Sequence, residues 1–352
     1  MNPVPGIDQL SQDTVSSQHA SRRTFLKGVG IAGAASLAGP LLASTTARAS
    51  TGTLIYGIND HDGSYDNYAH FTADNPSGFQ YSYRAYDDTV WEQTSDVPKT
   101  WINDNPGNNY MNWSVRPDLN LLLRGTFDQQ IIALLATAPD HANLTMWHEA
   151  AAPPNCGPGN NYAVYAPTSI GGTGTKGSWM TAQNLKAGHA HMQNLCASNP
   201  NANGNHVSYG QIFIGPADQS QVGDWIASNL DWYGIDIYDN SIYWNDPDAT
   251  DPSKTTLNQS AINTRMTNDK QFLDSKATGY KLHITETNSP VIQHRKNWAL
   301  YLSEWMSNNG GYRFQWFYKC GGKLSGCYSD LETSTRDYFA DTLIPTYGKP
   351  IA

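Results

Sequence analysis

The chain alternates between short apolar runs and longer amphipathic stretches. Eight short runs bounded by Gly, Pro, Asn or Asp predict strands, at residues 53–59, 79–86, 112–117, 144–150, 207–214, 233–239, 281–285 and 312–318. Helical periodicity follows most of them, at residues 127–138, 179–197, 257–275, 294–307 and 334–343. This order predicts one α/β domain, a (β/α)8 TIM barrel. An open doubly wound sheet is the alternative, but no Gly-rich phosphate loop follows the first strand.

Two of the predicted strands end in a glutamate. One is the run Trp147-His148-Glu149, and the other contains Thr285-Glu286. The carboxyl ends of barrel strands meet on one face, so we expect both carboxyl groups there. Hydrolysis of a glycosidic bond needs one protonated carboxyl group that donates and one ionised carboxylate that attacks. The sequence therefore predicts Glu149 and Glu286 as the catalytic pair of a retaining glycosidase.

Other strand ends supply candidates for substrate binding, namely His148, Tyr238, Trp316, Arg84, Asp60 and Trp147. Tyr238 ends the sixth strand, next to the seventh, and is placed to donate a hydrogen bond to Glu286. Trp316 is predicted to offer a flat face to a sugar ring. Each has a structural alternative, a buried histidine for His148 and core packing for Tyr238 and Trp316.

Composition narrows the classes of function. The chain has 11 Trp and 20 Tyr, which serve either a core or sugar stacking, whereas charged residues are 15% and the net charge is −9. A basic face for nucleic acid is therefore not expected. No Gly-x-Ser-x-Gly elbow of an esterase occurs. His189 and His191 are two apart in a predicted helix and point in different directions, so neither a metal nor another cofactor is expected.

Residues 1–49 have the features of a twin-arginine signal peptide. Arg22 and Arg23 precede a weakly apolar Gly/Ala-rich stretch that contains Pro40 and is too short to span a bilayer. The small-x-small triplet 47–49 is a cleavage site, which leaves residues 50–352 as the barrel domain. We expect an extracellular protein that has no membrane segment after cleavage and is monomeric.

All four cysteines lie in the mature part, at positions 156, 196, 320 and 327. An even number in an exported protein favours disulfides, with three possible connectivities. Local pairing of Cys320 with Cys327 is the simplest, which leaves Cys156 with Cys196. A metal site is the alternative. The irregular region 153–177 follows the strand that carries Glu149, and we expect it to form a wall of the cleft.

The motifs Trp147-His148-Glu149, Thr285-Glu286 and Gln315-Trp316 resemble glycoside hydrolase family 26, which includes β-mannanases, and its clan of retaining barrel enzymes. The resemblance implies that Glu149 is the acid/base and Glu286 the nucleophile. It makes β-mannan the leading polysaccharide substrate, with β-glucan or xylan as alternatives. The competing function is a barrel that binds carbohydrate without cleaving it.

Overall fold

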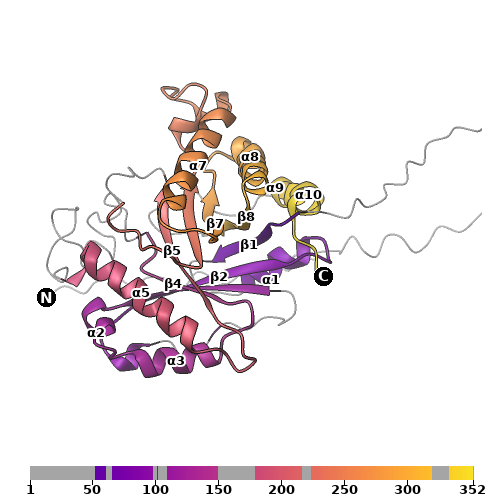
Figure 1. Ribbon diagram of the computed structural model, residues 1–352. Coiled ribbons are helices and arrows are strands. Elements are labelled where there is room, and N and C mark those ends of the chain that lie inside the picture. Colours follow the sequence, from indigo (N-terminus) through magenta and orange to yellow (C-terminus); the bar gives the residue numbers. More distant parts are fainter. Residues whose placement is uncertain are drawn as a thin grey trace, which may run out of the picture. The chain divides into compact units, whose positions relative to one another are not determined.

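The computed structural model describes residues 52–60, 66–97, 101, 109–149, 179–215, 223–318 and 333–351. Its eight strands pair in chain order as a closed parallel barrel (Figure 1), which confirms the predicted (β/α)8 fold. The strands are β1 (Ile55–Asp60), β2 (Tyr81–Trp91), β3 (Asn109–Pro117), β4 (Asn143–Met146), β5 (Ser208–Gly215), β6 (Trp232–Tyr238), β7 (Lys281–Asn288) and β8 (Gly311–Tyr318).

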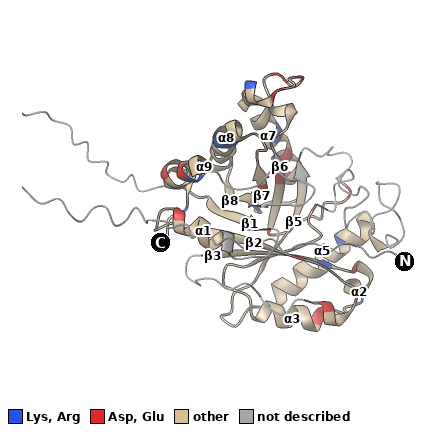
Figure 2. Ribbon diagram, turned by 180° about the vertical axis from the view of Figure 1, so that it is seen from behind, with Lys and Arg blue, Asp and Glu red and all other residues tan. Residues whose placement is uncertain are grey.

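Helices surround the barrel. The sequence predicted α3 (Asp128–Ala136), α5 (Ala182–Ser198), α7 (Gln259–Asp274) and α8 (Arg295–Asn308). It also predicted the closing helix, which the structure divides into α9 (Thr333–Tyr338) and a π-helical turn, η9 (Phe339–Leu343). The helices α1 (Asp66–Asp74), α2 (Leu119–Leu123) and α10 (Ile344–Tyr347) were not predicted. Figure 1 shows α2, α3 and α5 gathered on one side of the barrel, and Figure 2 shows how sparse charged residues are.

Polar side chains hold the inside of the barrel together. Asn112 donates a hydrogen bond to Gln315 at 2.9 Å, Gln315 donates to Ser82 at 3.2 Å, and Arg313 donates to Asn112. Every bond crosses between strands, so the buried amides and the guanidinium are paired rather than left at a desolvation cost. Gly57 permits close approach of β1 to β2, because a Cβ there would lie 1.9 Å from the Ser82 carbonyl oxygen.

The pairing of β6 with β7 contains an irregularity that sets the register at the mouth of the barrel. Ile235 is opposite Ile284, but the next residue, Asp236, is opposite Glu286, so Thr285 is the extra residue of β7. A bulge of this kind re-aims the side chains around it. It brings Asp236 and Glu286 level with each other on adjacent strands.

Several predictions concern residues outside the described ranges. The signal peptide 1–49, the whole region 153–177 and three cysteines, Cys156, Cys320 and Cys327, all lie there. Cys196 in α5 is a buried free thiol, 1% exposed, so the structure does not show the disulfide predicted for it. Within the described ranges, no helix combines the length and apolar character needed to cross a membrane.

Candidate active site

Three carboxyl groups meet at the mouth of the barrel. Glu149 follows β4, Asp236 lies in β6 and Glu286 in β7, and one oxygen of each is within 4.8 Å of the others. The structure thus brings together the two glutamates that the sequence singled out. Carboxyl groups about 5–5.5 Å apart are typical of retaining glycosidases, whereas inverting enzymes separate them by about 6.5–9.5 Å. Oxygen atoms of Glu149 and Glu286 that lie within 4.8 Å of each other are compatible with the shorter class.

Glu286 is buried, 5% exposed, and is held from two sides. The Tyr238 hydroxyl donates a hydrogen bond to its Oε2 atom, as the strand order predicted. The Arg84 guanidinium lies 3.3 Å from its Oε1 atom. A hydroxyl donor and a cation on separate oxygens stabilise a charged carboxylate and fix its orientation. Arg84 is fully buried, so it acts on Glu286 rather than offering itself to solvent.

Asp236 was not among the sequence candidates, and it connects the other two carboxyl groups. Thr285, the bulged residue, donates from Oγ1 to Asp236 Oδ1 at 2.6 Å, and Arg84 lies 3.7 Å from the same oxygen. Asp236 also shares a hydrogen bond with Glu149. Ionised carboxylates only accept hydrogen bonds, so this contact requires one proton on the pair.

The proton of that pair resides on Glu149. Burial raises the pKa of Glu149, and the negative charge of Asp236 and the hydrogen bond to it raise that pKa further. Burial also raises the pKa of Asp236, but the Arg84 cation and the hydrogen bond from Thr285 oppose this increase. Glu149 is therefore the carboxyl group that keeps its proton to higher pH, which is the requirement for a general acid.

A count of charges agrees with this assignment. Arg84 contacts two of the carboxylates, and Arg116, itself 5% exposed, acts electrostatically on Glu149. Arg116 also acts on the carboxylate of Asp87, so the two cations do not balance three ionised carboxylates, and one proton on Glu149 lowers the excess negative charge. Three ionised carboxylates would bury an excess negative charge, which is costly in a low-dielectric site.

The backbone that carries Glu149 is unusual. Trp147 has φ +47° and Glu149 has φ +59°, in the left-handed region that side-chain-bearing residues rarely adopt. The Trp147 N–H donates to the Val115 carbonyl oxygen at 2.9 Å, and the Glu149 N–H donates to the Ile212 carbonyl oxygen at 3.1 Å. These bonds to neighbouring strands hold the turn that directs Glu149 toward the other carboxyl groups.

The other predicted binding residues lie in different places. His148 is 6% exposed, and its ring packs 4.5 Å from that of Tyr86, the same ring that the Arg84 guanidinium covers at 4.5 Å. Trp316 is fully buried and packs against Phe339 of η9, on the helix side of β8.

Trp147 also faces the helix layer. It is fully buried, its ring lies edge-on to Trp179, and its Nε1 atom donates to the Pro117 carbonyl oxygen at 2.6 Å. Stacking of a sugar on Trp147 or Trp316 is therefore not what this structure supports. Asp60 ends β1 at the same face of the barrel, but its side chain lies outside the described part.

Tyr86, which was not a candidate in the sequence analysis, contacts residues of the site. The ring of Tyr86 in β2 packs against both the Arg84 guanidinium and the His148 ring. The Asn59 side chain donates a hydrogen bond to the Tyr86 hydroxyl at 2.9 Å. A polar residue two positions before a strand-end tyrosine shares its face, because side chains alternate along a strand. That spacing between Asp236 and Tyr238 was the available signal for Asp236.

The three carboxyl groups are also a set that a divalent cation could bind. Arg84 already places a positive charge against Asp236 and Glu286, and Tyr238 and Thr285 each donate to one of them. The chemistry described below uses the carboxyl groups as acid, base and nucleophile.

No protein-family model and no curated protein sequence matches the chain. Similar solved structures include a ruminal GH26 endo-β-1,4-mannanase, with 12% identity, 85% of this chain and 64% of that chain covered, and a TM-score of 0.47. A GH26 β-mannanase from Bacteroides ovatus has 9% identity, 84% and 89% coverage and a TM-score of 0.47. Thermotoga maritima Cel5A in complex with mannotriose has 9% identity, 83% and 97% coverage and a TM-score of 0.47. The function proposed next rests on the carboxyl geometry and not on these neighbours.

Proposed function

We propose that this protein is a secreted retaining glycoside hydrolase that cleaves a β-linked polysaccharide. The observation that carries the proposal is the placement of Glu149 and Glu286 oxygens within 4.8 Å of each other at the mouth of the barrel. The resemblance of the short motifs to family 26 makes β-mannan the first substrate to test, followed by β-glucan and xylan. Export is proposed from the twin-arginine segment alone.

In the first step, Glu149 donates its proton to the glycosidic oxygen while the Glu286 carboxylate attacks the anomeric carbon. The bond to the leaving sugar breaks, and a glycosyl ester of Glu286 forms. In the second step, Glu149, now ionised, removes a proton from a water molecule that attacks the same carbon. This step releases Glu286 as a carboxylate and restores the proton of Glu149.

The surrounding residues each serve one of these states. Tyr238 and Arg84 stabilise the charge on Glu286 before attack and after release. Asp236 keeps the proton on Glu149 until the leaving oxygen takes it. Two carboxyl groups in one cluster thus acquire opposite protonation states from their neighbours.

The test is a screen of the mature protein, residues 50–352, against mannan, β-glucan and xylan, with released reducing ends as the readout. We expect Glu149→Gln and Glu286→Gln to lower turnover by about three orders of magnitude or more. The first removes the group that transfers the proton, and the second removes the group that forms the covalent bond to the sugar. Glu304→Gln in α8 is the matched control, because Glu304 bonds to Gln259 on the helix layer.

Analysis of the first product should show the anomeric configuration of the substrate retained. Inverted product would assign a different mechanism to the same pair. Binding of a polysaccharide with no reducing ends released on any member of the panel would instead favour a carbohydrate-binding barrel without catalysis.

A further inference from the structure

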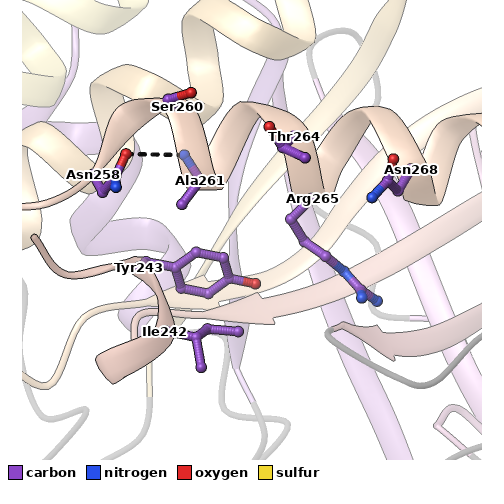
Figure 3. A pocket seen from close by; sticks show the side chains of 8 residues that line it. All are labelled: Ile242, Tyr243, Asn258, Ser260, Ala261, Thr264, Arg265 and Asn268. Atoms are coloured by element: carbon purple, nitrogen blue, oxygen red, sulfur yellow. Dashed lines mark hydrogen bonds between the residues drawn. The ribbon is translucent and has the colours of Figure 1, made fainter. Parts of the chain in front are cut away.

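A recess lies outside the candidate active site, between the 3-10 helix η6 (Ser241–Tyr243) and helix α7. It has a volume of about 450 Å³, within the range of about 300–1,000 Å³ typical of small-molecule sites. Figure 3 shows the side chains that line it: Ile242, Tyr243, Asn258, Ser260, Ala261, Thr264, Arg265 and Asn268. None of them belongs to the candidate active site.

One wall of this recess, which we call the η6–α7 groove, is apolar. Ile242 is 54% exposed, and among the described residues only three other large hydrophobic side chains, Leu123, Ile292 and Ile351, are classed as exposed. Ile242 lines the recess. The apolar wall is therefore a surface that gains from being covered.

The opposite wall is polar without net charge. Asn258, Ser260, Thr264 and Asn268 present amides and hydroxyls, as Figure 3 shows. Arg265 is the one charged lining residue, and Asp269 holds its guanidinium with contacts of 2.8 and 2.9 Å. A groove of this composition does not select for an anion or a cation.

A buried tyrosine, Tyr243, forms the floor of the groove. Tyr243 is 1% exposed, and its hydroxyl oxygen makes no hydrogen bond to the described residues. Burial raises the pKa of this tyrosine, so the group stays a neutral donor and acceptor. In Figure 3 the ring lies between Ile242 and α7, with the hydroxyl end directed toward Arg265. The oxygen is covered by protein atoms, so Tyr243 contributes packing to the floor of the groove rather than a hydrogen bond to a ligand.

The groove is preformed because its two walls are joined. The Asn258 N–H donates to the Tyr243 carbonyl oxygen at 2.6 Å, and Trp244 forms a β-bridge with Leu257. Trp244 in turn donates from Nε1 to Asp239 at 2.8 Å. Because these contacts already hold the groove in place, binding would cost little conformational entropy. A ligand that makes only a few contacts could therefore still bind.

The polar character continues across α7. A second recess of about 550 Å³ flanks the helix and shares three residues with the first, Ser260, Thr264 and Asn268. These residues are four apart, so they form one ridge with steps of about 6 Å along the helix. The residues that line only the second recess are again amides and hydroxyls: Gln259, Asn263 and Thr267.

We infer that the η6–α7 groove and the adjoining ridge form an accessory binding surface for a neutral polysaccharide. The C–H face of a sugar ring would cover Ile242, and its hydroxyls would bond to the amides and hydroxyls of α7. Because η6 begins three residues after Tyr238, the groove is close in sequence to a residue of the candidate active site. The inference rests on the proposed function for the identity of the ligand as the polysaccharide substrate.

The test uses affinity electrophoresis of the full mature chain carrying Glu286→Gln, in gels containing mannan, β-glucan or xylan. Ile242→Ser removes the apolar wall, and Thr264→Lys fills the groove from an exposed position. Gln271→Lys is the matched control, because it adds the same charge two turns further along the same face of α7, outside both recesses. Melting temperatures of all variants confirm folding.

We expect both groove variants to reduce the apparent affinity for one polysaccharide by about tenfold, equivalent to loss of a few well-placed contacts. The control should migrate as the parent does. With active Glu286, the groove variants should also lose rate on polysaccharide relative to a short oligosaccharide.

Unchanged retention of both groove variants would overturn the inference and leave the hydrolase proposal standing. Absence of retention of the parent in every gel would overturn it as well. Retention that depends on the groove, together with no cleavage by the unsubstituted protein, would support the accessory surface and refute the hydrolase.

Discussion

Asp236→Asn tests whether a neighbouring carboxylate sets the protonation of Glu149. The substitution keeps the shape of the side chain and a partner for the Thr285 hydroxyl, but it removes one negative charge from the cluster. That charge raises the pKa of Glu149. The acid form of Glu149 is active and is lost as pH rises through its pKa, so a lower pKa moves the alkaline limb of activity to lower pH.

The separation of the carboxyl groups gives the magnitude. Two unit charges no more than 4.8 Å apart interact by about 3.5 kcal/mol or more with an effective dielectric constant of about 20. This energy corresponds to about 2.5 pH units. Loss of Asp236 also frees Arg84 to act more strongly on Glu149, in the same direction. Solvent and structural relaxation reduce the effect, so we expect the alkaline limb to move down by about 1 to 2.5 pH units.

The assay is kcat/KM against pH, from initial rates of reducing-end release. Asp231→Asn is the control, because Asp231 immediately precedes β6 at its opposite end and is exposed. Five residues of strand place it about 16 Å from Asp236, beyond the screening length of about 10 Å in ordinary buffer. An alkaline limb that stays in place or moves upward in Asp236→Asn would refute this explanation of the Glu149 proton.

Three further predictions follow from single contacts. Tyr238→Phe removes the hydroxyl donor to Glu286 and should lower kcat by about 10- to 100-fold, the value of a hydrogen bond to a charged group; single-turnover rates measure it, and full kcat would contradict the contact. Trp316→Ala should cost about 3–5 kcal/mol of unfolding free energy while KM per folded molecule stays constant, because the ring packs against Phe339; denaturant titration with a parallel KM distinguishes packing from stacking on substrate. Gly57→Ala should destabilise the barrel by about 3 kcal/mol or more, since its Cβ would meet the Ser82 carbonyl oxygen at 1.9 Å; a melting temperature equal to that of the parent would show that β1 and β2 can separate.

The sequence predicted the strands well because each is an apolar run between turn residues, and it predicted Glu149 and Glu286 because they end such runs. It did not predict Asp236, because this residue lies inside a predicted strand and the candidates were taken from the strand ends. The bulge at Thr285, which places Asp236 level with Glu286, depends on pairing between strands and leaves no local signal. The same limit applies to Trp316: the apolar run of β8 does not reveal which of its faces meets the helices.

The left-handed backbone at Glu149 has a consequence for how this protein would change under selection. A side-chain-bearing residue in that conformation costs about 1–2 kcal/mol relative to glycine. Glu149→Gly would therefore recover folding energy at the very position proposed to protonate the substrate. Laboratory evolution for thermostability alone would therefore tend to replace this glutamate. If lineages selected for hydrolysis keep it, the difference in stability between the two sets of lineages measures the stability cost of the reaction.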